Sequence, residues 1–195
     1  MTDPRIARTQ QDLFSALDDL LSEKPFREIS VSDLARRANV GRQTFYRHFD
    51  SIGAMLNLRL QTELADQIRS VQHSTAQAKK EDRLLQISRF AFERVGAQPH
   101  IARAILSGEA GSNALAAFRE QIIALWANAP SDPLADVPPD YLGYASTFYA
   151  GAMSAILLHW LDSDCSPDAE TMSRLVAVLS KRTEADWAAM APPGE

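Results

Sequence analysis

The stretch that decides the fold lies near the N-terminus and reads Gly41-Arg42-Gln43-Thr44-Phe45-Tyr46-Arg47-His48-Phe49-Asp50. At 3.6 residues per turn, Phe45 and Phe49 lie on one face of a helix, whereas Gln43 and Arg47 project from the other side. The apolar face belongs in a core and the polar, basic face belongs in solvent. The stretch therefore predicts an amphipathic helix that presents hydrogen-bonding side chains outward.

The residues just before this stretch predict a second short helix. Ser30 and Asp33 have the spacing of a capping box with Ser30 as the N-cap, so we expect a helix over residues 31–38. Asn39 follows where that helix must end, and asparagine can take the left-handed conformation that a tight turn between two helices requires. The unit is therefore a helix, a short turn and a second helix.

The distribution of charge points to a nucleic acid as the partner. Residues 34–49 contain four arginines (Arg36, Arg37, Arg42 and Arg47) and neither Asp nor Glu, in a chain of 195 residues whose formal net charge is −5. Arg and Gln can make paired hydrogen bonds to purine edges in the major groove, while Thr, Tyr and His can bond to phosphate oxygens. A helix-turn-helix that binds double-stranded DNA is the favoured interpretation. The alternative is an ordinary helical hairpin whose basic face is only solvated.

The run from Ser30 to Phe49, followed by Ser51 and the apolar residues 54–56, resembles the N-terminal signature of the TetR family of transcriptional repressors. The most recognisable matches are Thr44, Phe45, Tyr46, His48 and Phe49. The resemblance implies that base edges are approached by Arg42, Gln43 and Tyr46, and that phosphates are held by Thr44, Arg47 and His48. It also implies a homodimer that releases a palindromic operator when a small-molecule ligand binds.

The chain departs from the family pattern at four positions, the first of which is Asn39 in place of the usual turn Gly. Gly41 stands where the family usually has a Ser N-cap, which costs only a few tenths of a kcal/mol. Ile52 occupies a position where many members carry a phosphate-binding Lys, so we expect that contact to be missing and expect Ile52→Lys to tighten DNA binding. Gly53 is expected to weaken the first turn of the next helix.

The rest of the chain shows helical periodicity and no sustained period-2 alternation, so the predicted fold class is all-α. We expect a first helix from Asp3-Pro4 to Lys24, with Ile6 in its apolar stripe, and further helices over residues 51–71, 81–95, 101–106, 113–126 and 141–161. A last helix follows Pro167 and places Met172, Leu175, Val176, Leu179, Trp187 and Met190 on one stripe. The expected domains are a helix-turn-helix DNA-binding domain, residues 1–50, and a helical regulatory and dimerisation domain, residues 51–195. Residues 120–195 hold 3 basic and 11 acidic residues, which predicts an acidic end remote from DNA.

The segment from Tyr141 to Leu161 is 21 residues long and has no formal charge. Its length alone permits a membrane span. Against this interpretation, it contains Gly, Ser, Thr and His, and acidic residues flank it on both sides. A helix packed by its own domain and by another subunit is favoured. Together with the last helix of each subunit it would form a four-helix dimer interface.

Aromatic and apolar residues in the second half of the chain are candidates for lining a ligand cavity between helices, because such sites are apolar with a few polar groups. The candidates are Phe92, Trp126, Phe148, Tyr149, Met153 and His159. Each of them also fits ordinary core or interface packing. The sequence names no particular effector.

Catalytic and metal-binding patterns are not found in the sequence. It has no HExxH motif, no paired ligands at tight spacing and no nucleophile signature, so we expect neither an enzyme nor a metal or cofactor site other than that for the effector. The single cysteine, Cys165, excludes an internal disulfide, and the N-terminus lacks a secretory pattern, so the expected compartment is the cytoplasm. The competing class is an all-α enzyme or interaction protein with an incidental helix-turn-helix.

Overall fold

The structure is a computed structural model and describes residues 4–59, 80–127 and 137–180. Every regular element within these ranges is a helix, which confirms the all-α fold class. The predicted continuation of the fourth helix over residues 60–71 lies outside the described residues, as do Trp187 and Met190.

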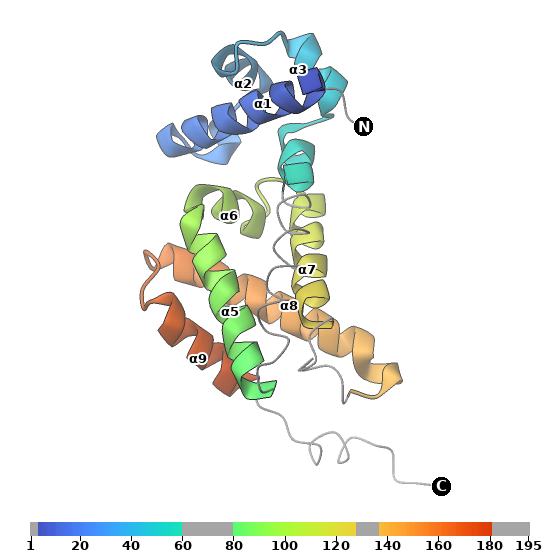
Figure 1. Ribbon diagram of the computed structural model, residues 1–195, viewed down its shortest axis with the longest axis vertical. Helices are drawn as coiled ribbons and strands as arrows, with labels where there is room; N and C mark the ends of the chain where they lie inside the picture. Colours follow the sequence, from blue (N-terminus) through green and yellow to red (C-terminus); the bar gives the residue numbers. More distant parts are fainter. Residues whose placement is uncertain (1–3, 60–79, 128–136, 181–195) are drawn as a thin grey trace, which may run out of the picture. The chain divides into compact units, whose positions relative to one another are not determined.

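The elements follow the order that the sequence predicted, with boundaries that differ by a few residues. They are α1 (Pro4–Glu23), the short 3-10 helix η1 (Phe26–Glu28), α2 (Val31–Arg37), α3 (Arg42–His48), α5 (Lys80–Ala97), α6 (Pro99–Leu106), α7 (Ser112–Ala127), α8 (Pro139–Asp162) and α9 (Ala169–Leu179) (Figure 1). Residues 52–59 are also helical and are called the 52–59 helix below.

The chain divides into two compact units. Unit 1 comprises residues 1–64 and 98–118, and unit 2 comprises residues 65–97 and 119–195. Packing therefore groups the 52–59 helix, α6 and the first part of α7 with the helix-turn-helix, whereas the sequence placed everything after residue 50 in a second domain. These segments are grouped because their buried side chains belong to one core cluster. The division at residue 50 stays a proposal about function.

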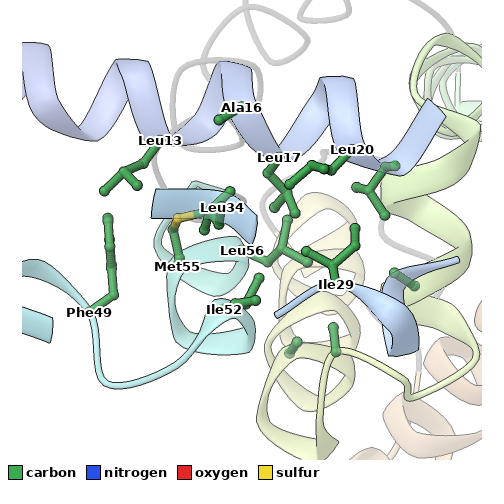
Figure 2. Close-up of a cluster of buried hydrophobic side chains, with 14 of the residues drawn as sticks. Leu13, Ala16, Leu17, Leu20, Ile29, Leu34, Phe49, Ile52, Met55 and Leu56 are labelled. Atoms are coloured by element: carbon green, nitrogen blue, oxygen red, sulfur yellow. The ribbon is translucent and has the colours of Figure 1, made fainter. Parts of the chain in front are cut away.

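The core of unit 1 is built on one face of α1. Leu13 and Leu17 are fully buried there, and the 52–59 helix contributes Met55 and Leu56 to the same cluster (Figure 2). Ile6, in contrast, is 39% exposed, so the buried stripe of α1 starts later than predicted because the first turns of the helix extend past the core. Burial of each large aliphatic side chain contributes about 1.5–3 kcal/mol, which makes this cluster a firm base for α2 and α3.

The helix-turn-helix forms as its local sequence requires. Ser30 and Asp33 make both bonds of the capping box at the start of α2. Asn39 has φ of 54°, the left-handed conformation expected at the turn. Gly41 is the N-cap of α3, and the helix ends at Phe49, whose backbone is extended.

Unit 2 is organised around α5, which packs against α8 and α9. The ring of Phe92 meets Trp160 of α8 edge to face, with centroids 5.1 Å apart. Arg89 links α5 to α9 through an ion pair with Glu170, with a nitrogen–oxygen distance of 2.7 Å. These contacts join residues that are far apart in the sequence.

The predicted helix over residues 141–161 is present as part of α8, and it is buried on one side only. Ala145, Tyr149 and Met153 are buried. Tyr144 is 80% exposed and Phe148 is 60% exposed on another face of the same helix. Among the described residues, no helix is long and apolar enough to cross a membrane.

Candidate nucleic-acid interface

Helix α3 has the two faces that its sequence predicted. Phe45 is completely buried, and Tyr46 is 52% exposed. Arg42, Gln43 and Arg47 are exposed as well. The side chains of this outward face carry donors and acceptors that can hydrogen-bond to base edges. Their donors can also hydrogen-bond to phosphate oxygens.

Two other predicted residues, Thr44 and His48, are half-buried at the margin of this face. The Nη2 group of Arg47 donates to the hydroxyl oxygen of Thr44 at 3.3 Å, one turn earlier in α3. His48 lies beside Phe49, with ring centroids 6.2 Å apart. All six side chains that the sequence assigned to DNA thus lie on or beside one face of a single helix.

The free positive charge is more limited than the count of four arginines suggested. Arg36 pairs with Asp33 at 2.8 Å, one turn earlier in α2. Arg37 reaches across to α1 and pairs with Glu23, also at 2.8 Å. A guanidinium that already has a carboxylate partner has less charge to offer to a phosphate.

Arg42 and Arg47 differ from this pair, because neither makes an ion pair with a carboxylate in the part of the chain that the structure describes. Both lie on α3, one at its first turn and one at its last. Within the described residues, the unpaired positive charge of the candidate interface is therefore carried by the same helix as the groups that the sequence predicts to approach base edges.

Asp33 fixes the start of α2 against the end of α1. Its carboxylate accepts a hydrogen bond from the Lys24 ammonium at 2.9 Å and another from the Ser30 hydroxyl at 2.8 Å. The Lys24 ammonium and the Ser30 donors hold the pKa of the Asp33 carboxyl well below its usual range. The carboxylate therefore stays charged and keeps α2, and with it the turn into α3, in place.

The burial of Ile52 argues against the expectation that Ile52→Lys tightens DNA binding. Ile52 is only 8% exposed and belongs to the core of unit 1, where it packs with Met55 and Leu56 (Figure 2). Ala104 and Ile105 of α6 and Ala114 of α7 belong to the same cluster as Ile52. A lysine at position 52 would thus enter the core rather than extend toward a phosphate.

The expectation for Gly53 considered helix propensity alone, and the structure adds a packing reason for glycine at this position. A methyl group there would overlap the backbone carbonyl oxygen of Ala110, in the turn between α6 and α7. Glycine at this position permits the close approach of two backbone segments, which is a benefit that helix propensity alone does not include. A glycine in an otherwise well-formed helix start is the sequence signal that could have indicated this close approach.

The six candidate residues for a ligand cavity have different environments. Phe92, Tyr149 and Met153 are buried in unit 2. Phe148 and His159 are exposed on α8. The side chain of Trp126 lies outside the described residues. The cavity thus stays a prediction, and only three of its six candidates are seen in the interior.

Unit 1 contains a small, half-open cleft between the end of α1, η1 and α6. Leu21 and Phe26 line it on one side and Ala104 on the other. None of the six predicted cavity residues contributes to it.

Comparison with known proteins identifies the N-terminal segment. The family described as bacterial regulatory proteins, tetR family, matches residues 13–57. An uncharacterized HTH-type transcriptional regulator of Bacillus subtilis (strain 168), YxbF, is 36% identical over 65 residues. That match covers 33% of this chain and only 17% of the relative, so this chain spans a small part of the relative's length.

Solved structures resemble the chain over most of its length. The transcriptional regulator FadR from Bacillus subtilis, in complex with stearoyl-CoA, has a TM-score of 0.62 and 13% identity, and the match covers 87% of this chain and 96% of that one. The fatty acid degradation regulator FadR from Bacillus halodurans has a TM-score of 0.69 and 16% identity, covering 92% and 96%. A TetR transcriptional regulator from Rhodococcus sp. RHA1 has a TM-score of 0.58 and 18% identity, covering 89% and 96%. At such identities the likeness establishes a shared fold.

Proposed function

We propose that the protein is a homodimeric DNA-binding transcriptional regulator of the tetR type, because the model of that family of bacterial regulatory proteins matches its residues 13–57. We expect it to act as a repressor that leaves a palindromic operator when a small molecule binds to unit 2. The observation that carries the proposal is the exposed face of α3, with Arg42 and Arg47 free of carboxylate partners among the described residues.

In this proposal α3 enters the major groove. Arg42, Gln43 and Tyr46 approach base edges, because they are the exposed side chains nearest the start and middle of the helix. Arg47, Thr44 and His48 hold phosphates and so fix the register of the helix on the duplex. The hydrogen bond between Arg47 and Thr44 supports the phosphate role, because it limits the rotamers of the arginine before DNA arrives.

A homodimer is proposed through α8 and α9. Apolar side chains are exposed on both helices, namely Leu142, Tyr144, Phe148, Leu175, Val178 and Leu179. Large apolar side chains left exposed on a helix are a common sign of an association surface. A two-fold axis through such a surface gives two heads for the two halves of a palindromic operator.

The effector is proposed to be a small molecule that binds among the helices of unit 2. Phe92, Tyr149 and Met153 are the interior candidates for contact with it. Trp126, Phe148 and His159 remain further candidates, and the exposure of Phe148 suits the dimer surface equally well. The B. subtilis FadR structure, which has the same fold, is a complex with stearoyl-CoA, so long-chain acyl-CoA is a reasonable first probe.

We further propose that the protein has no catalytic activity of its own and acts in the cytoplasm. Its functional groups are then those that bind DNA, the partner subunit and the effector. An effector can shift DNA affinity only through a difference in its affinity for the two states of the dimer, and tenfold weaker operator binding corresponds to about 1.4 kcal/mol of such coupling.

The test begins with DNA. Duplexes selected from a randomised pool by the purified protein should converge on a palindromic sequence, and a mobility shift should show binding at nanomolar protein that mixed-sequence DNA of equal length does not show. No enrichment of any sequence after repeated selection would reject the proposal. If the dimer binds the selected duplex but acyl-CoA and other ligands leave its affinity unchanged, the DNA-binding part of the proposal stands and the ligand-response part is rejected.

A further inference from the structure

The 52–59 helix holds Arg59 in a specific place against α1. The Nη1 group of Arg59 donates to the Asp18 carboxylate at 2.6 Å. Its guanidinium carbon also lies over the ring of Phe14, 5.6 Å from the ring centroid, within the range of a cation–π contact. Only 11% of the Arg59 side chain is exposed, so this charge is largely enclosed by its partners.

From Phe14 a row of aromatic rings leads to the surface of α3. The centroid of Phe14 lies 6.0 Å from that of Phe49, and Phe49 lies 5.8 Å from Phe45. Phe45 in turn meets Tyr46 edge to face, at 5.4 Å and an interplanar angle of 83°. Each separation is within the range in which aromatic rings contact and orient one another.

The row begins in the interior and ends on the candidate DNA surface. Phe45 is completely buried and Phe49 is 5% exposed, whereas Tyr46 is 52% exposed. Protein interiors are close-packed, so a displacement of one buried ring is transmitted to the next rather than absorbed by empty space. The Tyr46 ring thus lies against Phe45, which is connected through Phe49 and Phe14 to the Arg59 guanidinium.

We propose that Arg59 is a positioning residue for Tyr46. The inference rests on the proposed function, because it assumes that Tyr46 contacts DNA. Arg59 acts through the three phenylalanine rings and does not touch the duplex. Its ion pair with Asp18 fixes the guanidinium over Phe14, and the ring row then holds the Tyr46 hydroxyl where it discriminates between DNA sequences.

A purely structural clamp between the 52–59 helix and α1 is the competing interpretation. Removal of a clamp lowers the stability of the fold. At a temperature where the protein stays folded, this removal leaves the discrimination between DNA sequences unchanged. If Arg59 positions Tyr46, the effects of mutating these two residues on DNA affinity should be coupled, although three phenylalanine rings separate their side chains. Mutations at sites that share no partner add within about a factor of two in the equilibrium constant, so larger coupling requires a physical connection.

The experiment is a double-mutant cycle of Arg59→Ala and Tyr46→Phe in the full-length protein. The probes are a duplex selected from a randomised pool by the parent protein and a mixed-sequence duplex of the same length, with affinities measured by fluorescence anisotropy at one fixed salt concentration. Circular dichroism confirms that each variant is folded at the temperature of the assay. If Arg59→Ala does not fold, Asp18→Asn replaces it, since it breaks the same ion pair and keeps the arginine stem over Phe14.

Arg37→Ala is the matched control. Arg37 also joins a neighbouring helix to α1 by an ion pair, with Glu23 at 2.8 Å, but it belongs to α2 and no ring of the row lies beneath it in the described contacts. A second control, Arg59→Lys, keeps a cation between Asp18 and Phe14 and should restore most of the discrimination that Arg59→Ala loses.

We expect Arg59→Ala to reduce the ratio of specific to non-specific affinity several-fold, and the loss caused by Tyr46→Phe to shrink by more than about twofold in that background. Arg37→Ala should leave both the ratio and the effect of Tyr46→Phe unchanged. Additive losses for Arg59→Ala and Tyr46→Phe, or equal losses on both duplexes, would overturn the positioning role. A parent protein that does not discriminate between the duplexes would overturn the proposed function itself, and the two failures are therefore separable.

Discussion

The carbonyl oxygen of Ala110 lies so close to the Cα atom of Gly53 that no side chain fits between them. Ala110 belongs to the turn between α6 and α7, in which Gly108 and Gly111 have φ of 82° and 99°. The start of the 52–59 helix and a turn more than fifty positions later are thus held in direct backbone contact. Any side chain at position 53 would require one of these two backbone segments to move.

Gly53→Ala should destabilise the protein by about 1–3 kcal/mol, because an added methyl group forces one of two packed backbone segments to move. The expected sign is opposite to that of an ordinary glycine in a helix, where alanine is favoured by up to about 1 kcal/mol. Urea unfolding followed by circular dichroism measures the difference. Gly151→Ala is the control, since Gly151 lies inside α8 and a methyl group there would pack against no atom of the described residues within 4 Å. Equal stability of parent and Gly53→Ala would show that the contact is loose in solution.

Ile52→Lys should destabilise the fold rather than tighten DNA binding. The side chain at position 52 is buried among apolar groups, and an ammonium group placed there loses its hydration without gaining a partner. We expect a loss of about 3 kcal/mol or more in unfolding free energy, against about 0.5–1.5 kcal/mol for the control Ile52→Val. Chemical denaturation distinguishes the two. A lysine variant as stable as the parent, with a steeper salt dependence of DNA binding, would return position 52 to the DNA surface.

These two positions show where sequence reasoning reached its limit. Ser30, Asp33 and Asn39 were placed correctly because capping and turn conformations depend on neighbours within a few residues. The burial of Ile52 and the role of Gly53 depend on α6 and α7, which local patterns cannot bring into contact with them. The contact of Arg59 with Phe14 was also not predicted, because the two residues belong to helices that are distant in the sequence.

The candidate site shows the same division. The inward position of Phe45 and the outward position of Arg47 follow from helical periodicity, and the structure agrees with both. The pairing of Arg37 with Glu23 was not predicted, because the two residues belong to different helices. The exposure of Phe148 could not be predicted either, since an apolar residue at helical spacing has the same sequence signal whether a core or a second subunit covers it.

Arg42→Ala should weaken binding to a selected operator by about 1–3 kcal/mol per half-site contact and relax the preference at one base position, as expected when a paired contact to a base edge is lost. Titration of the parent and variant against the operator and its single-base variants measures both effects. Arg36→Ala is the control, because Arg36 is equally exposed but is paired with Asp33. The same loss on every sequence would assign Arg42 to a phosphate instead.

Asp33→Asn should reduce stability in a manner that depends on pH. The pKa of Asp33 is lower in the folded chain than its ordinary value of about 3.9 in an unfolded chain. Its contribution is therefore fully present above that value and is lost as the pH falls below it, toward the folded pKa. The gap in urea midpoint between the parent and Asp33→Asn should be widest near pH 7 and should narrow below about pH 4. Lys24→Gln removes the largest cause of the shift and should flatten the pH dependence, whereas a constant gap from pH 7 to pH 3 would contradict this account.

Val178→Asp should convert the dimer into a monomer. Val178 is 61% exposed on α9, and on α8 Tyr144 is 80% exposed, so a charge introduced into this apolar surface would be buried without a partner if two subunits met there. Two heads on a two-fold axis engage major grooves about 34–36 Å apart, and a monomer reaches only one of them. Loss of the second head should weaken operator binding by about 100-fold, while affinity for an isolated half-site stays the same. Sedimentation analysis gives the oligomeric state, and Ala116→Asp, at an exposed position on α7, is the control for an added charge. A Val178→Asp protein that remains a dimer with full operator affinity would place the subunit interface on another face of the molecule.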